Sequence, residues 1–170
     1  DIPNLDKLAG RLNGRIPSGG SGKGGLDITQ RELDEIVTRG TNAMVDLGYA
    51  YEEDMNSIES NGMLETDNGV SERAMNRGMK ALGTLGSGNH FLELQTVQSV
   101  EDNNPHNLFE GQVVCMIHSG SRGLGHQVCT DHVRTLEDKY RNRDGVWQND
   151  EWGFEIQDRQ LAAAPVFSKE

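Results

Sequence analysis

The sequence predicts an α+β fold in which mixed or antiparallel central sheets are flanked by helices. Three observations support this class: a capped amphipathic stretch over residues 30–47, two strand-like apolar runs at 90–97 and 112–118, and a glycine-rich loop with a helical stripe after the second run. Hydrophobic residues are only 34% of the chain, and 21 residues are glycine. We therefore expect a loop-rich piece of a larger fold, incomplete at both ends.

The N-terminal part begins with a short amphipathic segment at residues 4–12, followed by a loop at residues 16–25 with the sequence IPSGGSGKGG. This loop resembles a phosphate-binding P-loop only in part. Pro17 stands where that motif needs its first glycine, and Gly24 stands where it needs serine or threonine. A surface loop or a loop beside an active site is the better interpretation.

Helix signals follow this loop. Thr29 and Glu32 have the spacing of a capping box, and apolar residues recur at helical spacing until Gly48 supplies a stop. The sequence predicts one helix over residues 30–47. Residues 49–70 are acidic and irregular, which indicates a solvated connection.

The central part predicts a short helix and two strands. One or two helical turns are expected at residues 71–78, and strands at 90–97 and 112–118. The second strand is almost continuously apolar, which predicts burial on both faces and makes Cys115 a core thiol. A helix starting near Leu124 should follow, and a further short helix is expected within residues 158–166.

Charge and cysteine content limit the classes of function. The net charge of −11 argues against broad, non-specific attraction to nucleic acid, although a focused arginine site for an anion stays open. No run of about 18 apolar residues suggests a membrane span, so we expect a cytoplasmic protein. Two cysteines do not suggest a disulfide scaffold.

The strongest candidate for a metal site is the pair His90 and His118. Each lies where a glycine-rich loop meets a strand, and antiparallel pairing of the two strands would place both imidazoles at one edge of the sheet. Glu93 follows the first histidine and Arg122 follows the second. Ordinary structural histidines remain the alternative.

The loop after the second strand is a candidate anion site. Ser119, Ser121 and Arg122 precede a helix, whose first N–H groups could join the guanidinium around a phosphate. A tight turn would explain the glycines equally well, and spacing alone leaves both open. His126, Cys129 and His132 do not suggest zinc, because the two histidines would be splayed by roughly 120° on a helix.

Two long motifs bring a family resemblance. Residues 85–95 (LGSGNHFLELQ) and 113–128 (VVCMIHSGSRGLGHQV) closely resemble the central motifs of the RtcB family of RNA ligases. The resemblance also takes in the loop at 16–25 and the segments DLGYAYEED, RAMNRG and QLAAAPV. It implies that residues 1–170 are the central portion of a single RtcB-like catalytic domain.

The resemblance implies a definite chemistry. Enzymes of this family use GTP and Mn²⁺ to join an RNA 3′-phosphate or 2′,3′-cyclic phosphate to a 5′-hydroxyl end, through a histidine–GMP intermediate. Expected partners are tRNA halves or broken RNA ends, together with an archease-like activating protein, and no membrane. Other metal ligands and the guanylylated histidine are expected outside these residues, so the chain alone should be inactive.

The resemblance also implies roles for particular residues. His90 and His118 match two metal-ligand histidines. The run that matches the nucleotide contacts is Asn89, His90, Phe91, Leu92 and Glu93, and a phosphate or RNA contact is expected at Arg122, Ser119 and Ser121. Two alternatives stay open: a non-catalytic module that binds a metal or an anion, and a phosphoesterase with a two-histidine metal site.

Overall fold

The computed structural model describes residues 5–18, 25–64, 69–148, 153, 155–158 and 161–164. Contacts divide the chain into two compact units. Unit 1 is Asp1–Leu26 with Lys80–Arg122, and unit 2 is Asp27–Met79 with Gly123–Glu170. Helices and two small antiparallel sheets occur together, in agreement with the predicted α+β class. Within the described part of the chain, no helix is long and apolar enough to cross a membrane.

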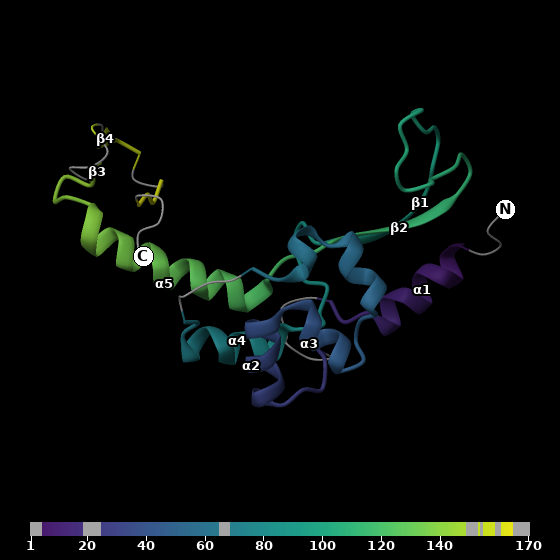
Figure 1. Cartoon of the computed structure of the whole chain (residues 1–170), viewed down its shortest axis with the longest axis horizontal. Coiled ribbons are helices and arrows are strands. Elements are labelled where there is room, and N and C mark those ends of the chain that lie inside the picture. Colours follow the sequence, from purple (N-terminus) through teal and green to yellow (C-terminus); the bar gives the residue numbers. More distant parts are fainter. Residues whose placement is uncertain are drawn as a thin grey trace. The chain divides into compact units, whose positions relative to one another are not determined.

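Unit 1 contains one helix and a two-stranded ribbon (Figure 1). Helix α1 spans Leu5–Arg15, strand β1 spans Phe91–Thr96, and strand β2 spans Val113–His118. The strands pair antiparallel, so the pairing that was the condition for the two-histidine site is confirmed. The six residues at 19–24, which include most of the predicted loop, lie outside the described residues.

The register of the ribbon sorts its side chains onto two faces. Phe91 pairs with His118, and Leu92 pairs with Ile117. Because successive residues of a strand point to opposite faces, Phe91, Glu93 and His118 share one face. The side chains of Leu92 and Ile117 therefore belong to the opposite face.

Burial of β2 on both faces is a wrong prediction. Val113 is 48% exposed and Ile117 is 61% exposed. Cys115 is exposed as well, so it is not a core thiol. The physical reason is that a two-stranded ribbon with one nearby helix offers too little surface to cover both faces of an apolar strand.

Unit 2 starts with two helices where the sequence suggested one. Helix α2 spans Gln30–Arg39, and helix α3 spans Thr41–Asp46. Gly40 separates them with φ of 55° and ψ of −133°, outside the helical region. A Cβ atom at Gly40 would lie 2.1 Å from the carbonyl oxygen of Gly62, so only glycine fits this close approach.

The predicted capping box at the start of α2 is confirmed. The carboxylate of Glu32 accepts from the N–H of Thr29 at 2.6 Å and from its hydroxyl at 2.8 Å, and Thr29 Oγ1 accepts from the N–H of Glu32. These hydrogen bonds, first from the backbone and then from the side chain of Thr29, lower the pKa of Glu32. The connection after α3 holds two 3₁₀ segments, Glu52–Ser57 (η1) and Glu59–Gly62 (η2).

Helices α4 (Glu72–Ala81) and α5 (Arg122–Tyr140) are joined by a polar network within unit 2. Gln127, which is 2% exposed, accepts from Nη1 of Arg77 at 2.9 Å and donates to Asp131 at 2.8 Å. Ser71 at the start of α4 also donates to Asp131, and these hydrogen bonds lower the pKa of Asp131. Helix α4 is longer than the predicted one or two turns.

The C-terminal part packs around one tryptophan. Trp147 is 1% exposed and begins β3 (Trp147–Gln148), which pairs with β4 (Glu155–Ile156). Neither of these short strands was predicted. Residues 161–164 are not helical, so the helix expected within 158–166 is wrong there, and the rest of that segment lies partly outside the described residues.

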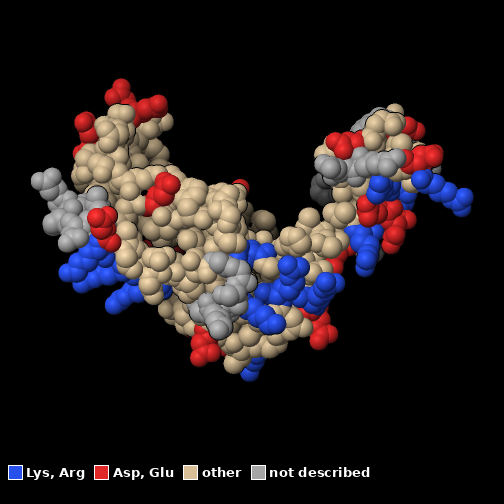
Figure 2. All heavy atoms as spheres, turned by 180° about the vertical axis from the view of Figure 1, so that it is seen from behind, with Lys and Arg blue, Asp and Glu red and all other residues tan. Residues whose placement is uncertain are grey.

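The tightly buried side chains of the described residues all belong to unit 2. They are Ile28, Leu33, Ala43, Ala74, Met75, Gln127, Tyr140 and Trp147. On the face drawn in Figure 2, Lys and Arg atoms form several groups, and Asp and Glu atoms lie beside them.

Candidate functional site

His90 and His118 meet at one end of the ribbon in unit 1. His90 immediately precedes β1 and His118 ends β2, so the antiparallel register makes them neighbours. Their ring centroids are 5.9 Å apart, with the ring planes at 47°. Metal–nitrogen bonds are roughly 2 Å long, so two rings at this separation are close enough to reach a common ion.

Phe91 supports the second histidine. The rings of Phe91 and His118 are stacked, with centroids 5.3 Å apart and planes at 16°. This pair lies directly across the two strands, where side chains of one face come closest. The phenyl ring therefore fixes one side of the imidazole of His118.

Arg122 contacts the first histidine. Its Nη1 atom lies 3.0 Å from Nδ1 of His90 in a part-buried setting. A guanidinium has only donors, so Nδ1 of His90 must accept this hydrogen bond. In a neutral imidazole the proton then resides on Nε2.

Two glycines shape the space around His90. Gly86 is buried with φ of 116°, and a Cβ atom there would lie 2.0 Å from Nδ1 of His90 and 2.6 Å from Nη1 of Arg122. On the other edge of the ring, a Cβ atom at Gly120 would lie 3.5 Å from Nε2. Glycine at position 86 lets the backbone approach Nδ1 more closely than any other residue would allow, whereas the separation at Gly120 is an ordinary contact distance.

The two serines of the candidate anion loop differ. Ser119 donates its hydroxyl to the carbonyl oxygen of Leu85 at 2.6 Å, which ties the loop after β2 to the glycine-rich loop before β1. Ser121 is exposed just before α5. Arg122 begins that helix with φ of 50°, an unusual backbone angle for a residue other than glycine.

The predicted nucleotide-contacting run is divided by the strand. Phe91 and Glu93 share the face of His118, and Glu93 accepts a hydrogen bond from Gln95 at 2.9 Å. Asn89 is exposed at the turn before β1. Leu92 points to the opposite face, so one bound nucleotide cannot contact it together with Phe91 and Glu93 through side chains of one face.

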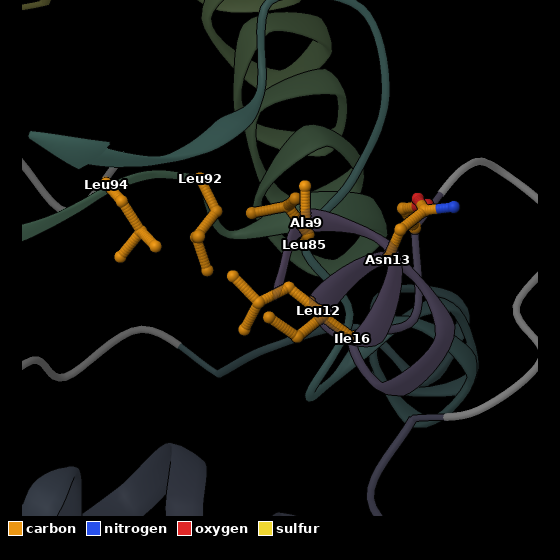
Figure 3. A pocket seen from close by; sticks show the side chains of 8 residues that line it. Ala9, Leu12, Asn13, Ile16, Leu85, Leu92 and Leu94 are labelled. Atoms are coloured by element: carbon orange, nitrogen blue, oxygen red, sulfur yellow. The ribbon is translucent and has the colours of Figure 1, made fainter. Parts of the chain in front are cut away.

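Leu92 instead lines an apolar pocket between β1 and α1, with a volume of about 300 Å³ (Figure 3). Leu94 lies beside it on the strand. Leu12 of α1 and Ile16, which directly follows the helix, point toward the two leucines (Figure 3). The remaining lining residues are Ala9, Asn13, Ser18 and Leu85. This pocket explains the apolar face of α1 by packing, on the side of the ribbon away from His118.

The donor set for a metal consists of two imidazoles. Among the described residues, no group of three or more His, Cys, Asp and Glu side chains is close enough to hold an ion. This includes His126, Cys129 and His132, for which zinc binding was not expected. Two imidazoles fit a metal ion as part of its ligand set, and further ligands would have to come from elsewhere.

Sequence reasoning identified the histidines and Arg122, but it missed the roles of Gly86, Gly120 and the carbonyl of Leu85. The repeated glycines of LGTLGSG were the available signal for a close backbone approach. The sequence could not tell which glycine makes contact, because that depends on how the loops before β1 and after β2 fold together.

Comparison with known proteins gives a consistent result. The family model for the tRNA-splicing ligase RtcB matches residues 1–170. The chain is 45% identical to the tRNA-splicing ligase RtcB of Archaeoglobus fulgidus over 99% of its own length, and 43% identical to that of Pyrobaculum aerophilum over 98%. It is 40% identical to that of Methanocaldococcus jannaschii over 98%.

Two imidazoles and a guanidinium thus lie together at one end of the ribbon of unit 1. The chain belongs to the RtcB family, as the match over its whole length shows. It spans about a third of the length of the first two of these relatives (34% each) and 17% of the third.

Proposed function

We propose that this chain is the central part of an RNA ligase that joins a 3′-phosphate or 2′,3′-cyclic phosphate end to a 5′-hydroxyl end in tRNA splicing or RNA repair. The reaction uses GTP and Mn²⁺ and passes through a histidine–GMP intermediate, whose histidine lies outside this chain. The observation that supports the proposal most directly is that His90, His118 and Arg122 lie together at one end of the ribbon. The ring centroids of the two histidines are 5.9 Å apart, and Nη1 of Arg122 lies 3.0 Å from Nδ1 of His90.

In this proposal His90 and His118 supply two of the ligands of Mn²⁺. A bound divalent ion would polarise phosphoryl oxygens and neutralise charge on the departing pyrophosphate. Imidazole suits Mn²⁺ less well than oxygen ligands do, so the remaining ligands should include a carboxylate from another part of the longer protein.

Arg122 supplies the positive charge for a phosphate of the nucleotide or the RNA. A guanidinium can hold two oxygens of a phosphate at once, which fixes orientation as well as charge. The side chains of Phe91 and Glu93 lie on the same face of the ribbon as His118, and Asn89 lies in the turn just before β1. From these positions they can contact the nucleotide. Leu92 supports β1 from the opposite face.

The test is reconstruction of a full-length enzyme by fusing flanking segments of a related ligase to this chain. We expect GTP-dependent joining of 3′-phosphate and 5′-hydroxyl RNA, together with a GMP adduct on the protein. His90→Ala and His118→Ala should each abolish joining, whereas His106→Ala, a histidine of the exposed connection between β1 and β2, should retain it. A fusion that folds but forms neither adduct nor product contradicts the proposal.

Assays of the fusion and of the 170-residue chain alone, side by side, separate the ligase from the two alternative functions. A two-histidine phosphoesterase would cleave phosphoesters when the 170-residue chain alone is supplied with Mn²⁺, without GTP. A non-catalytic module would bind Mn²⁺ or an anion with no reaction in either form. The ligase proposal expects no cleavage by the chain alone.

A further inference from the structure

We propose that Arg122 controls metal binding at His90, because it occupies the single lone pair with which the neutral imidazole could bind an ion. An anion that draws the guanidinium away opens this lone pair, so anion and metal bind with positive coupling. This inference rests on the proposed function, since it takes His90 as a metal ligand. Arg122 is therefore a positioning residue for the metal as well as a contact for the anion.

The exclusion follows from the chemistry of imidazole. A neutral imidazole has one N–H donor and one nitrogen with a lone pair, and Arg122 can only donate. The contact of 3.0 Å to Nδ1 therefore uses the lone pair and leaves the proton on Nε2. In this arrangement neither nitrogen of His90 is able to bind a metal.

Both routes to metal binding break the contact. A metal at Nδ1 takes the position that Arg122 occupies. A metal at Nε2, the edge that Gly120 leaves open, forces the proton onto Nδ1, where it would face an N–H of Arg122. Two donors cannot form a hydrogen bond, so the guanidinium has to leave in either case.

The positive charge of Arg122 also opposes metal binding at His90. The positive charge of the guanidinium near the ring disfavours a cation there. The backbone of Gly86 lies against both groups, since a Cβ atom at this position would overlap Nδ1 of His90 and Nη1 of Arg122. The contact is thus confined by a buried stretch of backbone rather than formed by two free surface side chains.

An oxyanion relieves both obstacles. A phosphate or sulfate group accepts hydrogen bonds from the guanidinium in a bidentate manner and neutralises its charge. By linkage, whatever the anion adds to metal affinity the metal adds to anion affinity.

The test uses the 170-residue chain with Mn²⁺ as the metal and sulfate as the anion. Ring ¹⁵N NMR of the metal-free chain should find His90 with its proton on Nε2. Mn²⁺ affinity, measured by electron paramagnetic resonance, should be about tenfold higher in sulfate than in chloride of equal ionic strength. Arg122→Ala should bind Mn²⁺ in chloride about as tightly as the unmodified chain does in sulfate, and sulfate should add less than about twofold.

Arg134→Ala is the matched control, because Arg134 is an exposed arginine of the same helix; it should keep the full response to sulfate. Equal affinities in chloride and sulfate, with no gain in Arg122→Ala, would overturn the inference while leaving the metal site intact. If NMR finds the proton on Nδ1 of His90 in the metal-free chain, that result alone overturns the inference. If His118→Asn binds Mn²⁺ as tightly as the unmodified chain, the metal role in the proposed function is wrong. The NMR result still decides separately whether Arg122 occupies the lone pair of His90.

Discussion

The ring of Phe91 stacks on the imidazole of His118, with centroids 5.3 Å apart and planes at 16°. The stack comes from directly paired positions of β1 and β2, so it links the run predicted to contact the nucleotide to the second histidine. Phe91→Ala removes the surface that orients the imidazole. We expect Mn²⁺ affinity of the chain to fall by about tenfold, the range found when a support of a metal ligand is lost.

Phe91→Tyr keeps the aromatic ring and serves as the control. Mn²⁺ titrations followed by electron paramagnetic resonance would compare the two variants. A Tyr variant as weak as the Ala variant would mean that stacking is not what positions His118.

Gly86→Ala should damage the site more than its backbone angle alone explains. The new Cβ atom would lie 2.0 Å from Nδ1 of His90, so the imidazole or the loop has to move. The matched control is Gly88→Ala, where φ is also positive at 72° but nothing lies within 4 Å of the added atom.

An alanine at position 88, in the left-handed region, costs about 1–2 kcal/mol. At Gly86, whose φ of 116° lies beyond that region, the overlap should add about 1–3 kcal/mol to the cost of the backbone angle. Urea unfolding measures the two costs, and ring ¹⁵N shifts of His90 should change only in Gly86→Ala. Equal destabilisation with an unchanged His90 would show that the backbone does not hold the Arg122 contact.

Gln127→Ala should destabilise unit 2. Gln127 is 2% exposed and bridges Arg77 of α4 to Asp131 of α5, so its loss removes two part-buried hydrogen bonds, one of them between the helices, and leaves a gap at a buried position. A cost of about 1–3 kcal/mol in the free energy of unfolding is expected. Asn76→Ala, an exposed change on α4, should stay within about 0.5 kcal/mol when both are measured by urea unfolding.

The capping box should give α2 a defined pH dependence. Thr29 lowers the pKa of Glu32 below its ordinary value of 4.5. A carboxyl whose folded pKa is lowered stabilises the fold above the unfolded pKa, and that stability is lost as pH falls through the folded pKa. The unmodified chain should therefore be more stable to unfolding than Glu32→Gln above pH 4.5, and this difference in stability should shrink below pH 4.5.

Thermal unfolding at a series of pH values, followed by circular dichroism, measures this difference. Glu101→Gln removes the same charge from an exposed connection and corrects for the net charge of −11. A difference in stability between the chain and Glu32→Gln that does not change between pH 6 and pH 3 would contradict the prediction, since this interval contains the ordinary glutamate pKa of 4.5.

Local signals in the sequence were sufficient for much of the fold. The Thr29–Glu32 box and the helix after SGSR formed as predicted, because each depends on contacts within a few residues. The two strand-like runs also formed at their expected places, although their pairing joins residues far apart in the sequence. The break at Gly40 depends on the carbonyl of Gly62, which lies 22 residues further along the chain. Burial of β2 failed as a prediction for a related reason, since an apolar pattern does not say whether a partner covers it.

For the candidate site, the sequence indicated which residue types meet but not how they touch. The motifs predicted that His90, His118 and Arg122 lie together, and the antiparallel pairing of β1 and β2 brings the two histidines to the same end of the ribbon. The donor contact to Nδ1 and the turn of Leu92 to the other face depend on loop conformation and strand alternation. The alternation could have been derived from the strand itself, because Leu92 and Glu93 are consecutive residues.

The histidines and the tightly buried side chains of the described residues belong to different units. Local opening in a protein follows the density of buried contacts, so the ribbon of unit 1 should exchange its amide hydrogens well before the helices of unit 2. A ligand that binds His90 and His118 would then slow exchange in β1 and β2 specifically. The site is thus placed in the part of the chain whose order a ligand can most readily increase.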